Sequence, residues 1–123
     1  MIQKFSFPKS NRILKRKDFL RLSKKGQKIH NKLFILVYCC NKDERKNSSR
    51  LGVTVSKKVG RACKRNRIKR LIREYFRVNK YAIKKACDIN IIAKKEVANQ
   101  SSDQVVYYLK DNFEKLSNRL SNK

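Results

Sequence analysis

Glycine and histidine are scarce in this sequence, and each shortage argues against a class of functional site. The 123 residues include three glycines and one histidine, with one proline and no tryptophan. With only three glycines, we expect no glycine-rich loop of the kind that holds nucleotide phosphates in P-loop proteins. We interpret His30 as a surface residue, because the sequence contains no second imidazole to form a metal site or an acid–base pair.

Acidic residues are also few, at nine against 34 lysines and arginines, which gives a formal net charge of +25. A metal-dependent nuclease needs several carboxylates that converge on its ions. Only Asp43 and Glu44 are close together in the sequence, and they lie in a polar stretch. We therefore expect no catalytic residue and no metal site in the protein alone. A polyanion, most simply a nucleic acid, is the expected partner.

The cysteines and the apolar segments exclude other classes. Cys39, Cys40, Cys63 and Cys87 form no C-x-x-C pair, so zinc-binding spacing is missing and free thiols are expected. No stretch is apolar over the length needed to span a bilayer, and the first residues lack the apolar core of a secretion signal. These features predict a cytoplasmic protein with no membrane partner.

The patterns that are present predict a single α+β domain of order α-β-β-α-β-α. We expect a basic N-terminal arm over residues 1–16, the domain over 17–120 and a tail over 121–123. Apolar periodicity predicts helices over 17–25 and from about 61 to 79, and strands over 33–40, 50–56 and 88–93. A last helix follows a Ser101–Gln104 capping box. The first two strands are most simply an antiparallel pair, in a mixed sheet covered by helices.

The stretch 64–77 carries the most informative pattern, an amphipathic helix with one apolar and one cationic side. Its apolar stripe has helical spacing and consists of Ile68, Leu71, Ile72, Tyr75 and Phe76. The polar residues roughly opposite this stripe are Asn66, Lys69, Arg70, Arg73 and Arg77. Arg65 lies at the near edge of that group and Arg67 on the other flank with Glu74. One acid faces seven lysines and arginines, which favours a polyanionic partner over a merely solvated surface.

Two segments together resemble the signature of the bacterial ribonuclease P protein component. They are Ser56-Lys57-Lys58-Val59-Gly60 and the run Arg65-Asn66-Arg67-Ile68-Lys69-Arg70-Leu71-Ile72-Arg73. The resemblance extends from about Asn11 to the C-terminal helix. It implies an α+β fold with a left-handed βαβ crossover, against the usual right-handed preference. It also implies a catalytic RNA subunit as partner, with the protein as a non-catalytic subunit of the endonuclease.

In that family the complex removes the 5′ leader of precursor tRNA, and the RNA subunit and substrate hold most of the Mg²⁺. The resemblance assigns RNA contacts to the residues that match the basic motif: Lys57, Lys58, Arg65, Asn66, Arg67, Lys69, Arg70 and Arg73. It assigns a leader-binding cleft to Phe19 and Val37, where aromatic side chains commonly stack on bases. Ser23 and Val37 depart from that aromatic pattern. A register shift that would bring Tyr38 into the cleft instead stays open.

Four other functions fit parts of the sequence. A small basic ribosomal protein would have the same size and charge, but composition alone does not explain the ordered motif. A DNA-binding protein could place the central helix in the major groove, although its cations spread over several turns suit phosphates better. An autonomous nuclease would need converging carboxylates, and the sequence offers no such group. A cationic protein that binds a membrane surface would have to insert apolar residues into the membrane, but the core already requires most of them.

Overall fold

The computed structural model describes residues 12–40, 49–79, 83 and 86–121. The elements are α1 (Arg16–Lys25), β1 (Gln27–His30), β2 (Phe34–Cys40), β3 (Arg50–Thr54), α2 (Ala62–Asn79), β4 (Cys87–Ala93) and α3 (Ser102–Ser121). Two short 3-10 turns, η3 (Lys57–Val59) and η5 (Lys95–Asn99), precede α2 and α3. The α+β class is confirmed. The predicted arm up to residue 11, most of the loop after residue 40 and residues 122–123 lie outside the described residues.

The four strands form one mixed sheet in the order β1-β2-β4-β3. β4 pairs antiparallel with β2 and parallel with β3, so β3, α2 and β4 form the βαβ unit that the resemblance implies. The prediction that β2 and β3 pair directly is wrong, because β4 lies between them. Six of the seven residues of β4 are buried, as expected for a strand that has a neighbour on each side and cover on both faces.

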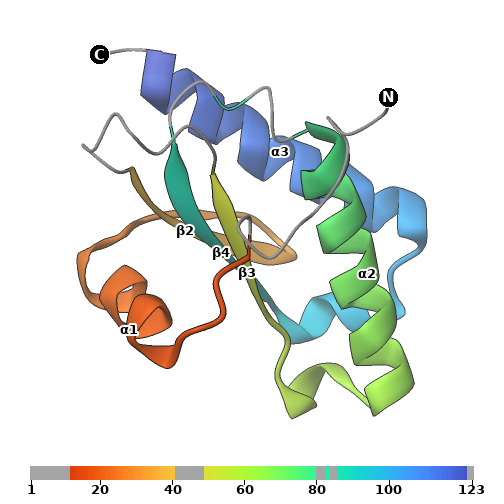
Figure 1. The fold of residues 1–123 in the computed structure, drawn as a ribbon. Helices are drawn as coiled ribbons and strands as arrows, with labels where there is room; N and C mark the ends of the chain where they lie inside the picture. Colours follow the sequence, from red (N-terminus) through yellow and green to blue (C-terminus); the bar gives the residue numbers. More distant parts are fainter. Residues whose placement is uncertain (1–11, 41–48, 80–82, 84–85, 122–123) are drawn as a thin grey trace, which may run out of the picture.

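The sheet is covered on both faces, as Figure 1 shows. α2 and α3 pack on one face over the main core, which includes Leu36, Leu51 and Ile91 from the strands. α1 and residue Ile13 cover part of the other face in a smaller cluster with Leu22 and Val37. Strand residues alternate between these faces, so Leu51 and Val53 both face the main core.

β1 is an element that the sequence analysis missed. Its four residues, Gln27–His30, pair with β2 at the edge of the sheet, and Ile29 is its one buried side chain. A four-residue edge strand with one apolar position has no clear period, because only one of its side chains packs on the core. His30 is exposed at its end, as predicted.

Two of the four cysteines are joined, which corrects the expectation of free thiols. Cys40 and Cys87 are directly opposite each other in the antiparallel register of β2 and β4 and form a disulfide. This bond links strands whose cysteines are 47 residues apart in the sequence. Cys39 and Cys63 are free. Cys39 and Cys40 point to opposite faces of the sheet, as neighbours in a strand must.

Candidate nucleic-acid interface

α2 docks on the core through the predicted apolar stripe. Ile68, Ile72 and Phe76 are at most 1% exposed, and Leu71 and Tyr75 pack against them at the edges. The helix starts after Gly60, whose φ of 147° lies in a region that side-chain-bearing residues rarely adopt. The stripe therefore fixes which side of α2 faces solvent, and the cationic side is the one presented outward.

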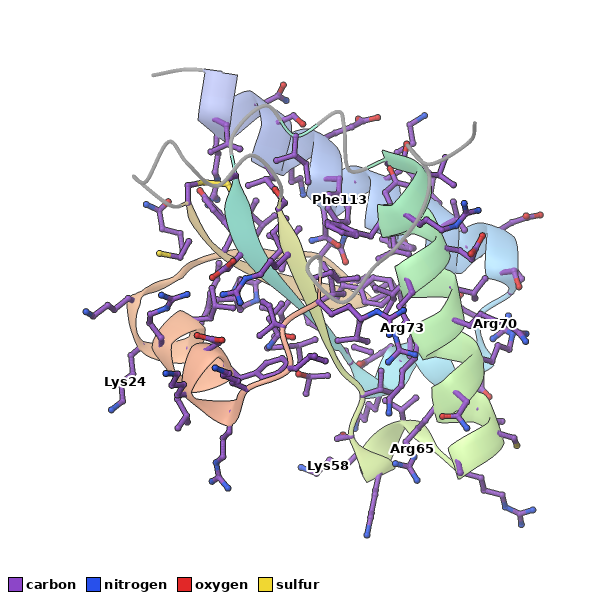
Figure 2. All side chains as sticks on the ribbon, in the orientation of Figure 1. Lys24, Lys58, Arg65, Arg70, Arg73 and Phe113 are labelled. Atoms are coloured by element: carbon purple, nitrogen blue, oxygen red, sulfur yellow. A yellow bond between two sulfur atoms is a disulfide. The ribbon has the colours of Figure 1, made fainter. Side chains whose placement is uncertain are left out.

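The outward side holds three of the predicted RNA-binding residues. Asn66, Arg70 and Arg73 are exposed, and none forms a hydrogen bond or ion pair with any residue in the described part of the chain. Lys69 is half-buried at the edge of this group. In Figure 2, Arg73 lies on the side of α2 toward β3 and Arg70 on the opposite side. The cations thus spread around the outer surface of the helix.

Arg65 and Arg67 are held by the protein itself. The Nε of Arg65 donates to the carbonyl oxygen of Gly60 at 3.1 Å. Arg67 Nη2 donates to the Ser102 hydroxyl at 3.0 Å and to the carbonyl oxygen of Gln100 at 3.3 Å. Arg67 therefore ties α2 to the start of α3. An RNA contact by Arg67 stays a prediction.

Lys57 and Lys58 lie in the turn η3 and not at the end of a strand, because β3 stops at Thr54. Both lysines are exposed, while Val59 of the same turn is buried. Figure 2 shows Lys58 and Arg65 both at the end of the molecule where α2 starts. The turn therefore extends the cationic surface beyond the N-terminal end of the helix.

Arg77, which the helical pattern grouped with the outward cations, has an acidic partner. Its Nε and Nη2 donate to the two carboxylate oxygens of Glu74, each at 3.0 Å. The hydrogen bond from Arg77 lowers the pKa of Glu74, and the same bond raises the pKa of Arg77. Among the described residues, this pair is the one place on α2 where an acid balances a cation.

Phe19 and Val37 lie on the α1 face of the sheet, where the leader-binding cleft is predicted. Phe19 is half-buried over Gly52, and a Cβ at that glycine would lie only 2.4 Å from Cε1 of Phe19. Val37 is 2% exposed in the smaller cluster that it forms with Ile13 and Leu22 under α1. Tyr38 faces the main core, and its hydroxyl donates to Oε1 of Gln27 at 2.9 Å. The register shift that would bring Tyr38 to the α1 face is therefore absent.

Sequence reasoning missed an ionic network on this same face. Asp88 is 1% exposed, and both Arg21 and Arg50 donate to its carboxylate. Arg50 also lies 3.6 Å from Asp18. The hydrogen bond to Asp88 raises the pKa of Arg50 above its already high ordinary value. The signal was an aspartate inside an apolar strand, since a buried carboxylate requires a cation or a hydrogen-bond donor.

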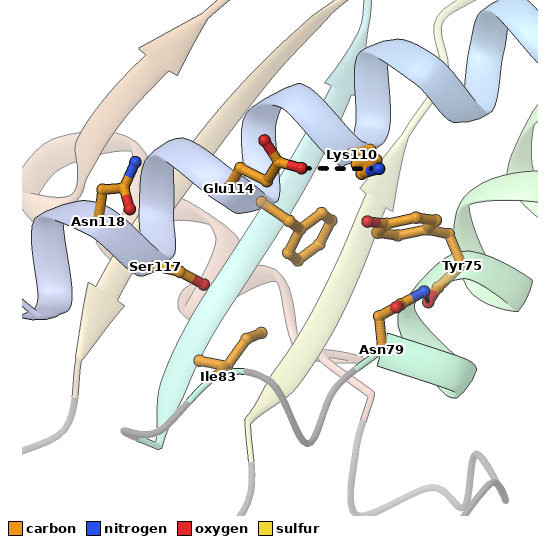
Figure 3. Close-up of a pocket in the computed structure, with 8 residues that line it drawn as sticks. Tyr75, Asn79, Ile83, Lys110, Glu114, Ser117 and Asn118 are labelled. Atoms are coloured by element: carbon orange, nitrogen blue, oxygen red, sulfur yellow. Dashed lines mark hydrogen bonds and ion pairs between the residues drawn. The ribbon is translucent and has the colours of Figure 1, made fainter.

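A separate cavity of about 390 Å³ lies between the end of α2 and α3 (Figure 3). Tyr75, Ile83 and Phe113 provide much of its lining, and the Tyr75 and Phe113 rings are 5.3 Å apart. The one lysine of its lining, Lys110, lies 3.8 Å from Glu114. This balance of charge makes the cavity a poor site for a phosphate group.

Two negative observations apply to the described part of the chain. No three His, Cys, Asp or Glu side chains gather closely enough there to hold a metal ion. No helix in that part is long and apolar enough to cross a membrane.

Comparison with known proteins agrees with this arrangement. Residues 7–117 match the family model for ribonuclease P. A ribonuclease P protein component from Desulforapulum autotrophicum is 45% identical over 112 residues, which cover 91% of this chain and 93% of that relative. A second, from Desulfatibacillum aliphaticivorans, is 45% identical over 113 residues, covering 92% and 93% of the two chains.

Solved structures share the fold. The RNase P protein of Staphylococcus aureus superposes with a TM-score of 0.79 at 40% identity, covering 85% of this chain and 93% of that one. The RNase P protein of Thermotoga maritima gives a TM-score of 0.71 at 32% identity, covering 88% and 96%. With a matching family model, relatives of nearly equal length and a shared fold, this chain belongs to the bacterial ribonuclease P protein component family.

Proposed function

We propose that this protein is the RNA-binding, non-catalytic subunit of a ribonuclease P. It binds a catalytic RNA and the 5′ leader of precursor tRNA, and it promotes removal of that leader. The observation that carries the proposal is the outward group Asn66, Arg70 and Arg73. These side chains belong to the run that resembles the family signature, and they have no partner among the described residues.

The chemistry of these side chains suits phosphate binding. An arginine guanidinium donates two parallel hydrogen bonds to a phosphate, and its charge does not depend on pH in the physiological range. Asn66 both donates and accepts, so it suits a sugar hydroxyl or a base edge. Lys57 and Lys58 add positive charge at the start of α2. This surface fits a folded RNA, with Arg65, Lys69 and Arg67 at its margins.

The α1 face supplies the second part of the proposal. Phe19 is half-buried beside a sheet surface that includes Val37. An unpaired leader base could stack on the Phe19 ring, whereas Val37 offers only apolar contact. Mg²⁺ in the complex would be held mainly by the RNA subunit and the substrate. The complex would work in the cytoplasm.

Recovery of the bound RNA separates this function from its main alternative. A tagged full-length chain expressed in its native host should co-purify with one short stable RNA that cleaves precursor tRNA in Mg²⁺. Recovery of ribosomal RNA in its place would support a ribosomal protein. The matched control is a variant with Arg70→Ala and Arg73→Ala, which should recover less of the same RNA.

A further inference from the structure

A hollow of about 330 Å³ lies at the start of α1, on the sheet face that α2 does not cover. Its lining includes five cations against one acid: Arg12, Lys15, Lys17, Arg21 and Arg50 against Asp18. None of these five belongs to the family motif on α2. A concave surface with this balance of charge suits an anion.

Two of the five cations are held from behind by a buried carboxylate. Asp88 on β4 accepts from Nε and Nη2 of Arg50, at 2.8 and 2.7 Å, and from Nη2 of Arg21. Asp88 is 1% exposed, whereas the side chains of Arg21 and Arg50 are 42% and 24% exposed. A guanidinium has five N–H donors, so each arginine keeps donors that Asp88 does not use. The carboxylate therefore fixes both groups at the wall of the hollow.

The N-terminal end of α1 adds to the same site. Lys15 is the N-cap residue, and its side chain makes no capping hydrogen bond. An uncapped helix start leaves N–H donors and a partial positive charge, which favour an anion. Asp18 lies in this first turn, but its carboxylate is 3.6 Å from Arg50 and 3.9 Å from Arg21. The hollow is therefore surrounded by the start of α1, by Lys15 and Lys17, and by the two arginines that Asp88 holds.

We propose that this hollow binds a phosphodiester group of RNA, and that Asp88 is a positioning residue that holds Arg21 and Arg50 for that contact. The proposal rests on the function proposed above. The phosphate could belong to the RNA subunit or to the precursor tRNA, since both offer the same chemistry.

Replacing Asp88 separates positioning from simple electrostatics, because the two predict opposite signs. Asp88→Asn keeps the shape of the side chain and raises the formal net charge by one from +25. If Asp88 only repels RNA, its removal tightens binding. If Asp88 positions the arginines, its removal weakens binding although the protein becomes more positive. Asp103→Asn, an exposed site on α3, is the matched control for the change in charge.

The experiment measures two dissociation constants over a range of salt concentrations, with thermal unfolding of each variant in parallel. One is for the protein with a bacterial ribonuclease P RNA, and the other is for precursor tRNA with the reconstituted complex. We expect Asp88→Asn to weaken one of them about tenfold, as for loss of a charge-assisted hydrogen bond, while Asp103→Asn does not. The salt slope for that RNA should also fall. The affected constant identifies which RNA supplies the phosphate.

Arg21→Gln keeps the test decisive if Asp88→Asn does not fold, because Arg21 is near the surface. It should weaken the same constant and lower its salt slope by about one unit, whereas Lys110→Gln on α3 should not. Unchanged binding by folded Asp88→Asn or by Arg21→Gln, or tighter binding by Asp88→Asn to the level of Asp103→Asn, would overturn the proposal. Wild-type protein that binds neither RNA would instead contradict the proposed function.

Discussion

The arginines of α2 divide into two groups according to what each guanidinium contacts. Arg67 donates to Gln100 and Ser102, and Arg77 donates to Glu74. Arg70 and Arg73 are exposed and make no such contact within the described residues. The helical pattern in the sequence could not separate the two groups. The partners of Arg67 lie outside α2, and the contact of Arg77 with Glu74 depends on the side-chain rotamers. Binding energy for RNA is therefore expected chiefly from the second group, with a further part from Arg65, whose one hydrogen bond to Gly60 uses only its Nε donor.

Arg70→Ala should weaken binding to the RNA subunit and flatten its dependence on salt. Each lost phosphate contact lowers the slope of log K against log salt by about one unit. Arg65→Ala should act in the same direction, with part of its effect through the lost bond to Gly60. Arg77→Ala is the matched control on the same helix. Slopes that stay unchanged for both Arg65→Ala and Arg70→Ala would remove α2 from the RNA interface.

Asp111 links acidity to the stability of the α3 packing. Partial burial raises the pKa of Asp111, but hydrogen bonds from Asn31 and Lys115 outweigh it and leave the pKa lowered. Its stabilising contribution is therefore present above the unfolded-state pKa of about 3.9 and is lost as the pH falls through the lower folded-state value.

Asp111→Asn should consequently reduce the free energy of unfolding at neutral pH by less than about 1 kcal/mol, since the pair is partly exposed. Denaturant unfolding of wild type and variant between neutral pH and about pH 2.5 measures the difference, which should shrink toward zero in acid. Asp103→Asn, with no such bonds described, is the control. A difference that persists at the acid end would contradict this role.

At the scale of elements, apolar periodicity predicted the helices that pack on the core through one face. α2 was predicted to run to about residue 79, and it ends at Asn79. The apolar stripe from Ile68 to Phe76, on which that prediction rested, includes the buried residues of the helix. Strand order was not predictable in the same way. β3 and β2 are neighbours in sequence, but β4, which comes later in the chain and is buried on both faces, lies between them.

The candidate site was predictable where it lies in one element and not where it joins several. The cations of α2 follow one another along a single helix, so their spacing is visible in the sequence. Asp88, Arg21 and Arg50 come from β4, α1 and β3, and only the sheet register brings them together. An aspartate next to an apolar strand core was the one available signal.

Phe19→Ala tests the contact between α1 and the leader. If Phe19 stacks on a leader base, precursor tRNA should bind to the reconstituted complex about tenfold or more weakly, and mature tRNA should bind nearly as before. Leu20→Ala, at an exposed neighbour on α1, is the control. Equal losses for both tRNAs together with a lower unfolding temperature would make Phe19 an ordinary core residue over Gly52.

At the scale of the whole molecule, two cationic surfaces flank one sheet. The outer side of α2 and turn η3 form the first, and the hollow at the start of α1 forms the second, on the opposite sheet face. A formal net charge of +25 opposes compaction through self-repulsion, so anions close to the folded chain are expected to stabilise it. RNA would supply them in the complex.

Polyvalent anions should therefore stabilise the isolated protein. We expect phosphate or sulfate to raise the unfolding temperature by several degrees more than sodium chloride at equal ionic strength, because bound anions favour the folded state. Arg21→Gln should reduce this gain more than Lys110→Gln does. An equal response to all salts would indicate screening alone and no anion site.

The most direct measurement is cleavage of a 5′-labelled precursor tRNA at low Mg²⁺. Three samples are compared: the protein, a bacterial ribonuclease P RNA, and the two together. We predict cleavage at the mature 5′ end by the pair and by neither component alone. Cleavage by the protein alone would show an autonomous nuclease. Cleavage by the RNA at the same rate with and without the protein would contradict a role in leader removal and leave a basic RNA-binding domain.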